Sequence, residues 1–287
     1  MRELLLAAIQ LHATPDVARN LAAADRWVRV AQARGAGIIV LPENYAGIAN
    51  AGQPPPCIAD PGTLETSPAI APFLTITRSW DGILILGGQP IAAAKGQHAN
   101  ACLVLHRGQI VARYDKIHRF HAIMPDGALL TEADTTAPGD VPVLVDWGAL
   151  RIGLGICYDL RFPEHYRALA SAGAHILIGP SAFTFPTGAA HWELLLRARA
   201  LENQAYMIAP AQDGHHAEGR QSWGHSMIVG PWGDILSQQS HGEGAVLATF
   251  SPAELTRVRT RLPALEHRLL NHETRARVVT LSESAHP

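Results

Sequence analysis

The sequence predicts a layered α/β fold with mixed sheets, and three patterns along its 287 residues lead to this class. Short apolar runs alternate with stretches of helical periodicity over the first 90 residues, which is typical of strands covered by helices. Hairpin patterns interrupt this alternation in the middle of the chain and add antiparallel strands. After residue 160 helix and strand alternate again. Since no repeat or linker divides the chain, we expect one domain.

The first third of the chain predicts three strands and two helices. Residues 4–11 form an apolar run that favours a strand, and Asp16 then has the character of a helix N-cap. Apolar residues recur at helical spacing from Val17 until Gly35. The runs GIIVL at 37–41 and ILIL at 83–86 are typical of buried strands, and a helix is expected between them at 67–80.

The remaining two thirds predict hairpins and a second alternation. We expect one hairpin over 101–114 that turns at Arg107-Gly108, and another over 141–157 that turns at Gly148-Ala149. Helices at 163–172 and 188–203 should alternate with strands at 175–178 and 205–209. The last predicted element is a hairpin over 226–237.

The composition excludes several classes of protein. With 23 basic and 25 acidic residues and no basic run, the chain does not have the charge of a nucleic-acid binder. No apolar run approaches the roughly 20 residues of a membrane span, and the N-terminus lacks a signal-peptide pattern. Three widely spaced cysteines form no disulfide framework, which favours a reducing, cytoplasmic location. Charged residues make up only 17%, against roughly 25% in an average chain, which indicates a large core or a subunit interface.

Cys157 lies in the most informative sequence context. It ends an apolar strand pattern and is followed, six residues later, by Pro163, which suits the first turn of a helix. A nucleophile at a strand-to-helix turn stands near backbone N–H groups that can bind an oxyanion. We expect a nearby helix N-terminus and a cation to lower the pKa of this thiol. The alternative is a buried, inert core cysteine.

Two charged residues are further candidates. Glu43 follows the strand GIIVL and Pro42, at the strand end where ligands gather in α/β sheets, although a solvated loop carboxylate is the plainer interpretation. Lys116 closes another predicted strand in a chain that has 21 arginines and only two lysines. A compact ammonium suits a specific role there, but a genome that favours arginine codons would also explain the scarcity.

Three motifs in order resemble the nitrilase superfamily of carbon–nitrogen hydrolases: LPEN at 41–44, YDKIH at 114–118 and GICYDLRFPE at 155–164. The resemblance covers nearly the whole chain and implies a four-layer αββα sandwich with mixed sheets, as one domain over 1–270 with a C-terminal tail over 271–287. It implies a Glu–Lys–Cys triad of Glu43, Lys116 and Cys157, with a further glutamate at Glu132 in TEADTTAPGD. It also implies no cofactor, no metal, and a homodimer or higher homo-oligomer formed through outer helices.

Segments 180–206, 219–236 and 261–268 resemble the Nit branch of this superfamily. That branch implies an amide of a 2-oxo dicarboxylate as substrate, with deaminated glutathione cleaved to 2-oxoglutarate and Cys-Gly. The alternatives are an ω-amidase that acts on 2-oxoglutaramate and an N-carbamoyl amino acid amidohydrolase. One departure concerns residues 117–127, where His121 and Ile123 replace aspartates that are usual in the branch.

The resemblance assigns a role to each catalytic residue. Glu43 is expected to take the proton of Cys157, while Lys116 and the Tyr158 backbone N–H stabilise the oxyanion. Glu132 is expected to orient Lys116 or the attacking water.

The substrate-binding residues are predicted less directly. Arg161 is a candidate cationic clamp for a substrate carboxylate, or else a structural arginine paired with Asp159 or Glu164. Three further residues are expected to line the pocket: Tyr45, Phe183 and Thr184.

Two other classes remain open from the residues alone. Gly214-His215-His216, with His225 and His241, would suit a metal-binding protein, although the spacing matches no known ligand pattern and solvated or core histidines explain it better. A non-catalytic interaction protein is the other class, and it leaves the Glu–Lys–Cys set unexplained.

Overall fold

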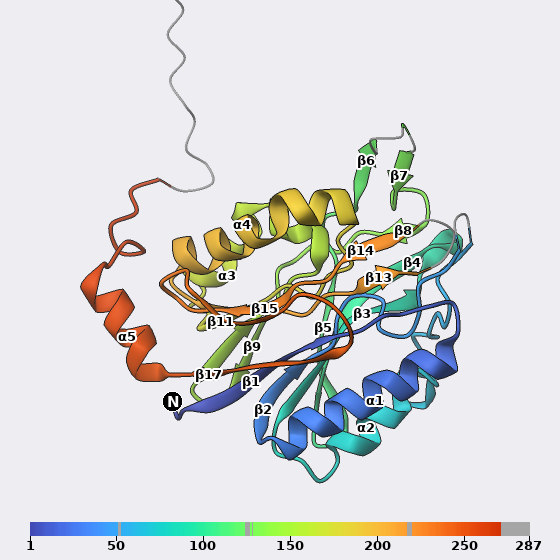
Figure 1. The fold of residues 1–287 in the computed structure, drawn as a ribbon, viewed down its shortest axis with the longest axis horizontal. Coiled ribbons are helices and arrows are strands. Elements are labelled where there is room, and N and C mark those ends of the chain that lie inside the picture. Colours follow the sequence, from blue (N-terminus) through green and yellow to red (C-terminus); the bar gives the residue numbers. More distant parts are fainter. Residues whose placement is uncertain (51–52, 124–126, 128, 217–219, 271–287) are drawn as a thin grey trace, which may run out of the picture.

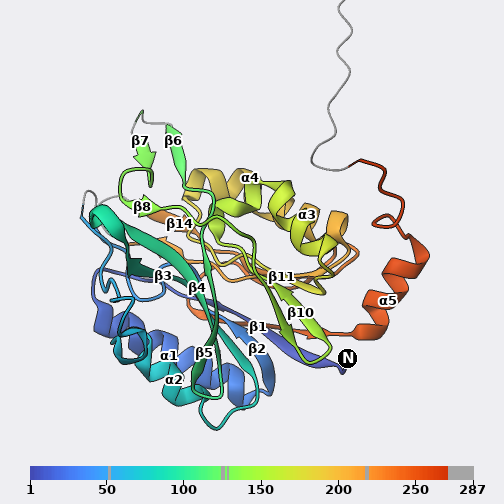
Figure 2. The ribbon, with the colours of Figure 1, turned by 180° about the vertical axis from the view of Figure 1, so that it is seen from behind.

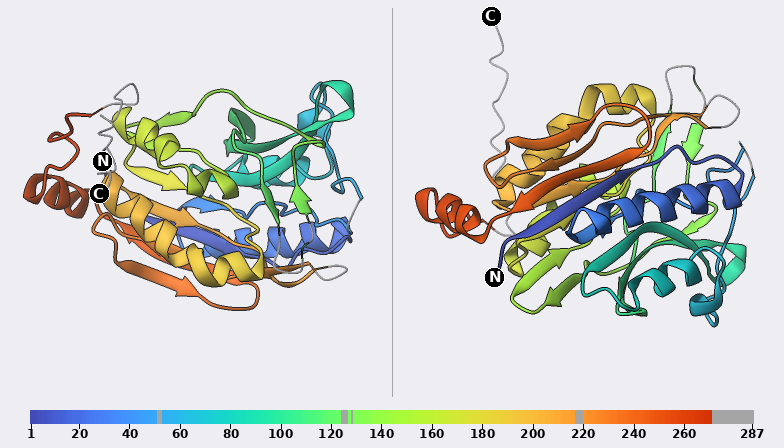
Figure 3. Two further views of the ribbon diagram at one scale, coloured as in Figure 1. Left: turned by 90° about the horizontal axis from the view of Figure 1, so that it is seen from above. Right: turned by 60° about the horizontal axis from the view of Figure 1, so that its bottom comes forward.

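Two mixed sheets lie face to face between two layers of helices in the computed structural model, which describes residues 1–50, 53–123, 127, 129–216 and 220–270 (Figures 1 and 3). Helices α1 (Val17–Ala33) and α2 (Ala71–Thr77) cover one sheet, and α3 (Pro163–Ser171) and α4 (Phe185–Asn203) cover the other. The expected αββα sandwich is therefore confirmed. Helix α5 (Pro252–Arg261) stands beside the sandwich. The tail 271–287 and part of the atypical 117–127 segment lie outside the described residues.

The first sheet has seven strands and combines parallel and antiparallel pairs. Its centre is parallel, and antiparallel strands close both edges. The order is β17 (Gly244–Phe250), β1 (Leu4–Gln10), β2 (Ala36–Val40), β3 (Ile83–Ala92), β4 (His98–His106) and β5 (Gln109–Asp115), with β8 (Thr136–Ala137) alongside β4.

The second sheet has six strands and is built in the same way, with three parallel strands in the middle. Its order is β16 (Ile235–Gln239), β15 (Ser226–Val229), β12 (Tyr206–Ala209), β11 (Ile176–Ile178), β10 (Leu150–Gly153) and β9 (Leu144–Trp147). Two small hairpins, β6 (His121–Ile123) with β7 (Leu129–Thr131) and β13 (Asp213–His215) with β14 (Gln221–Trp223), stand at one end of the sandwich (Figures 1 and 2).

The hydrophobic pattern of the strands explains the layers. In β2, Ile38 and Val40 pack into the core between the sheets, while Ile39, and Leu41 just after the strand, pack beneath α1 and α2. Successive side chains of a strand point to opposite faces, so a continuous apolar run is what a strand buried on both faces requires. None of the described helices combines the length and apolarity that crossing a bilayer requires.

Several elements differ from the sequence prediction. The helix predicted at 67–80 is shortened to Ala71–Thr77, because residues 67–70 form a turn before it. The strand of the second hairpin ends at Gly153, four residues before Cys157. The elements β17, α5 and both small hairpins are additional. Strand β17 pairs with β1 at the other end of the chain, and such distant pairing leaves no local turn signal.

Candidate active site

The three residues of the predicted triad come from segments that follow three different strands. Glu43 follows β2, Lys116 directly follows β5, and Cys157 follows β10 and opens the 3₁₀ helix η3 (Cys157–Arg161). The first two belong to one sheet and the third to the other, so the site lies where strand ends of both sheets meet.

The ammonium of Lys116 lies between two carboxylates. Its Nζ donates to Oε1 of Glu43 at 3.0 Å and to both carboxylate oxygens of Glu132 at 2.9 and 3.0 Å. The side chain is only 1% exposed. Burial disfavours the charge of Lys116, but the charges of Glu132 and Glu43 outweigh it and raise the pKa of the amine well above its ordinary value. Lys116 is therefore a fixed cation.

The carboxylate of Glu43 is held by groups from both sheets. Its Oε1 accepts from Asn100 Nδ2 at 2.9 Å, and its Oε2 accepts from the Ala182 backbone N–H at 3.1 Å. The Glu43 backbone carbonyl accepts from Gln212 Nε2 at 3.0 Å. Gly88 has a φ of +132°, and a Cβ there would lie 3.1 Å from the Cα of Glu43. The strand β3 can therefore pass this close only with glycine at position 88.

Cys157 is held in a strained turn beside Glu43. Its φ is +47°, a left-handed conformation that costs a residue with a side chain roughly 1–3 kcal/mol, and its N–H donates to Pro180 O at 2.9 Å. Burial, together with the negative charge of Glu43, raises the pKa of the Cys157 thiol well above its ordinary value, although Lys116 opposes this. The expectation that a helix N-terminus and a cation bring this pKa below its ordinary value is wrong, because burial and the Glu43 carboxylate outweigh the cation. The thiol thus keeps its proton next to a base.

Glu132 is attached to the hairpin that precedes it. Its Oε2 accepts from the Phe120 N–H at 2.7 Å, and its own N–H donates to Phe120 O at 2.8 Å. These bonds close the base of the β6–β7 hairpin and direct the Glu132 carboxylate at Lys116.

A family model for carbon–nitrogen hydrolases matches residues 5–260, a range that contains all four of these side chains. The chain belongs to the carbon–nitrogen hydrolase family.

Similar proteins agree with this assignment. A deaminated glutathione amidase of Synechocystis sp. is 39% identical over 279 residues, which cover 94% of the hydrolase and 99% of that protein. The crystal structure of the C. elegans NitFhit protein has a TM-score of 0.83 and 32% identity, over 93% of the hydrolase but only 65% of that chain. Nit3 of Saccharomyces cerevisiae, a member of branch 10 of the nitrilase superfamily, has a TM-score of 0.79 and 26% identity, over 94% and 97% of the two chains. The resemblance to the nitrilase superfamily is confirmed.

Next to the turn at Cys157, the hydrolase gathers three of the predicted substrate-binding residues: Tyr158, Arg161 and Phe183. The guanidinium carbon of Arg161 lies 5.9 Å from the ring centroid of Tyr158 and 5.3 Å from that of Phe183. Arg161 also contacts His191 Nδ1 at 3.3 Å. The backbone N–H of Tyr158 has no acceptor within the described part of the chain.

The alternative partners of Arg161 are not seen among the described residues. No ion pair joins it to Glu164, and the carboxylate of Asp159 instead accepts from His118 and Tyr114. Thr184 lies just before α4, where its Oγ1 is 2.8 Å from Oγ1 of Thr187.

The structure contradicts the expectation that Tyr45 lines the pocket. Tyr45 is fully buried in the outer core, against the edge of the Phe73 ring. Its hydroxyl lies 3.0 Å from Ala69 O and 2.8 Å from Gln89 Oε1. The side chain therefore anchors the loop after Glu43 to the layer under α2.

Sequence reasoning missed Asn100, Gln212 and Arg220. Asn100 is a polar residue within the apolar strand β4, and a polar residue in such a strand could have been predicted as a site residue from the sequence. Arg220 is exposed, donates to Ala49 O at 3.3 Å, and interacts electrostatically with the charges of Glu43 and Glu132.

The histidines considered for a metal site bond to protein groups instead. His216 contacts Ala13 O at 2.7 Å and Ser222 Oγ at 2.8 Å, and His225 stacks on Trp223 at 4.2 Å between ring centroids. Within the described ranges, no group of three His, Cys, Asp or Glu side chains is placed to hold a metal ion.

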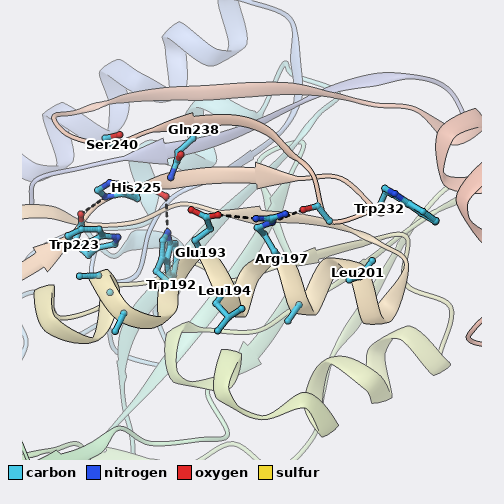
Figure 4. A pocket seen from close by; sticks show the side chains of 15 residues that line it. Trp192, Glu193, Leu194, Arg197, Leu201, Trp223, His225, Trp232, Gln238 and Ser240 are labelled. Carbon is cyan, nitrogen blue, oxygen red and sulfur yellow. Dashed lines mark hydrogen bonds and ion pairs between the residues drawn. The ribbon is translucent and has the colours of Figure 1, made fainter.

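A groove of about 820 Å³ lies away from this site, on the outer face of α4 (Figure 4). Leu194 is 71% exposed there and Trp232 41% exposed. Arg197 crosses the groove, with bonds to Glu193 and to the Gly233 carbonyl. The lining contains none of the triad residues.

Proposed function

We propose that the hydrolase is a cysteine-dependent amidase, most suited to deaminated glutathione, which it would cleave to 2-oxoglutarate and Cys-Gly. The observation that carries this proposal is the ammonium of Lys116, held between Glu43 and Glu132 beside the Cys157 thiol. A base, a fixed cation and a protonated nucleophile are the groups that acyl transfer requires.

In the first half-reaction, Glu43 takes the thiol proton as Sγ of Cys157 attacks the amide carbonyl carbon. A C–S bond forms, and the carbonyl π electrons move to oxygen. Lys116 and the free N–H of Tyr158 stabilise this oxyanion. Because the pKa of the thiol is raised, the proton transfer has to accompany the attack.

Acylation is complete when the oxyanion collapses: the C–N bond breaks as Glu43 gives its proton to the leaving nitrogen, and an acyl thioester remains on Cys157. In the second half-reaction, water gives a proton to Glu43 as its oxygen attacks the thioester carbon. The C–S bond then breaks, the carboxylic acid leaves, and the Cys157 thiolate takes the proton back from Glu43. Glu132 keeps Lys116 in place through both steps.

The substrate assignment rests on charge and on the relatives. The curated relative at 39% identity is named a deaminated glutathione amidase. Deaminated glutathione carries a carboxylate at each end, and Arg161 and Arg220 are two arginines that would bind them. Phe183, Tyr158 and Thr184 would line the acyl side of the pocket.

We further propose that residues 1–270 form one domain and that two copies associate through α4. The exposed Leu194 and Trp232 would be covered in such a dimer, as the low charged fraction favours. Leu194→Glu should then yield a monomer in light scattering.

Three free cysteines suit a reducing, cytoplasmic location.

An amide panel tests the function: deaminated glutathione, 2-oxoglutaramate, an N-carbamoyl amino acid and a simple nitrile. We expect the highest kcat/KM for deaminated glutathione, and an acyl adduct on Cys157 by mass spectrometry after rapid quenching. Preference for the nitrile or the carbamoyl compound would overturn the substrate, and turnover by Cys157→Ala would overturn the mechanism.

A further inference from the structure

A buried carboxylate joins the two segments that carry the nucleophile and the cation. Asp159 lies two residues after Cys157, and His118 lies two residues after Lys116. Asp159 is completely buried, and its Oδ1 accepts from the His118 backbone N–H at 3.1 Å and from His118 Nδ1 at 2.7 Å. The segment after β5 and the helix η3 are therefore fastened to each other immediately behind the reacting groups.

The other oxygen of Asp159 extends the same link. Its Oδ2 accepts from the Tyr114 hydroxyl at 2.7 Å and from the Ile156 N–H at 2.9 Å. The Tyr114 hydroxyl also accepts from the Ile117 N–H at 3.2 Å. The Asp159 carboxylate thus binds Tyr114 and His118, which lie two residues before and after Lys116. It also binds the backbone of Ile156, the residue just before Cys157.

We infer that the pair of His118 and Asp159 is a positioning device that fixes the Cys157 thiol relative to the Lys116 ammonium. This role rests on the proposed function, since it assumes that those two groups act on one substrate. Neither residue of the pair touches the reacting atoms, so both are positioning residues.

The chemistry of the pair favours positioning over simple packing. Burying a carboxylate is costly unless its oxygens are all hydrogen-bonded. Two apolar side chains of similar volume, in place of such a buried polar pair, often give a protein that is equally stable. Four directed hydrogen bonds give what an apolar pair does not, which is a fixed distance and angle between two loops. His118 is also stacked on Phe162, with 3.6 Å between centroids and 7° between planes, so its ring cannot rotate freely.

The surroundings keep Asp159 ionised. Burial acts to raise the pKa of Asp159, but the bonds from His118 and Tyr114 and the nearby His165 outweigh it and lower that pKa. Burial lowers the pKa of His165, whose Nε2 lies 2.8 Å from Leu154 O. An ionised carboxylate can only accept, so Nδ1 of His118 must be the donor.

Substitution of His118 tests the inference by kinetics. His118→Phe keeps the stack on Phe162 and removes the donor, whereas the side-chain amide of His118→Asn can stand where Nδ1–H stands. With deaminated glutathione, we expect His118→Phe to lower kcat about 10²-fold with KM within about threefold, and His118→Asn to recover most of the loss. His225→Phe is the matched control, because His225 also stacks on an aromatic ring but lines the groove of α4, and its ring bonds to Trp223 O rather than to Asp159.

A second readout needs no substrate. The rate at which iodoacetamide alkylates Cys157, relative to the half-buried Cys57, should fall about tenfold in His118→Phe, because the thiol is displaced from Glu43. If wild type turns over no amide, the proposed function fails while this ratio still decides the inference. An unchanged ratio, an equal kcat loss in His225→Phe, or no recovery in His118→Asn would each overturn the positioning role.

Discussion

Glu43 and Glu132 bind the same ammonium, yet they come from regions that are built differently. Glu43 is 3% exposed, and its bonds come from β4, from the loop after β11 and from the segment before β13. Glu132 has a side chain that is 28% exposed, and its further bond is to Phe120, at the base of its own hairpin. Farther along this hairpin, Ile123 is 76% exposed.

This difference separates two tasks of an active site. A base must stand within hydrogen-bond reach of one proton, which requires rigid neighbours on every side. A supporting charge has only to keep a cation in place, and a surface hairpin is sufficient for that. The hairpin also contains His121 and Ile123, the two residues at which the segment 117–127 departs from the resemblance to the Nit branch.

The largest effect is expected for Glu43→Gln. The amide cannot take the thiol proton, and general bases typically contribute 10²–10⁴-fold, so kcat should fall by about 10³-fold or more. Steady-state kinetics measure this, with circular dichroism to establish that the fold is retained. Substantial turnover by this variant would mean that another group removes the proton.

Glu132→Gln should have a smaller effect, which makes it a direct test of the comparison. The amide oxygen can still accept from Lys116, and Glu43 still compensates its charge, so kcat should fall about 10- to 10²-fold. Both variants are compared on one substrate at one pH. Equal losses would show that the hairpin carries as much of the chemistry as the interior does.

The sequence predicted the αββα fold, and that Glu43, Lys116 and Cys157 lie together, better than it predicted the residues that support them. Glu43, Lys116 and Cys157 each follow a predicted strand, so local pattern and motif place them. Asn100 and Gln212 support Glu43 across long stretches of chain, and no local pattern predicts such a contact. Tyr45 was misassigned because proximity to Glu43 in sequence does not decide which face a side chain takes. The thiol pKa was misjudged because burial depends on the whole fold.

Asn100→Leu tests how much the buried hydrogen bonds around Glu43 contribute to catalysis. The variant removes the bond from Nδ2 to Glu43, and it also removes Oδ1, which is buried and has no partner among the described residues. We expect kcat to fall about tenfold while the free energy of unfolding stays within about 1 kcal/mol, since Oε1 of Glu43 still accepts from Lys116 and is not left as an unpaired buried acceptor. Urea unfolding and kinetics on the same sample measure both. A fall in stability without a fall in kcat would make Asn100 a packing residue.

The smallest effect concerns the pH dependence of stability, which tests how fully the interior shields Cys157. In the unfolded chain the thiol titrates near pH 8.5, whereas burial and Glu43 raise its pKa in the folded state. Below pH 8.5 both states keep the proton. Above it the unfolded state binds fewer protons, so the free energy of unfolding falls as pH rises.

Cys157→Ala removes this contribution, and its alkaline slope should be shallower than that of wild type by up to about 1.4 kcal/mol per pH unit. Urea unfolding between about pH 8 and pH 10 measures both slopes. Cys57→Ala is the comparison variant: burial raises the pKa of that half-buried thiol less far than that of Cys157, so its slope should change less. Parallel slopes for wild type and Cys157→Ala would mean that the folded thiol ionises as readily as a free one, so that burial and Glu43 do not hold its proton.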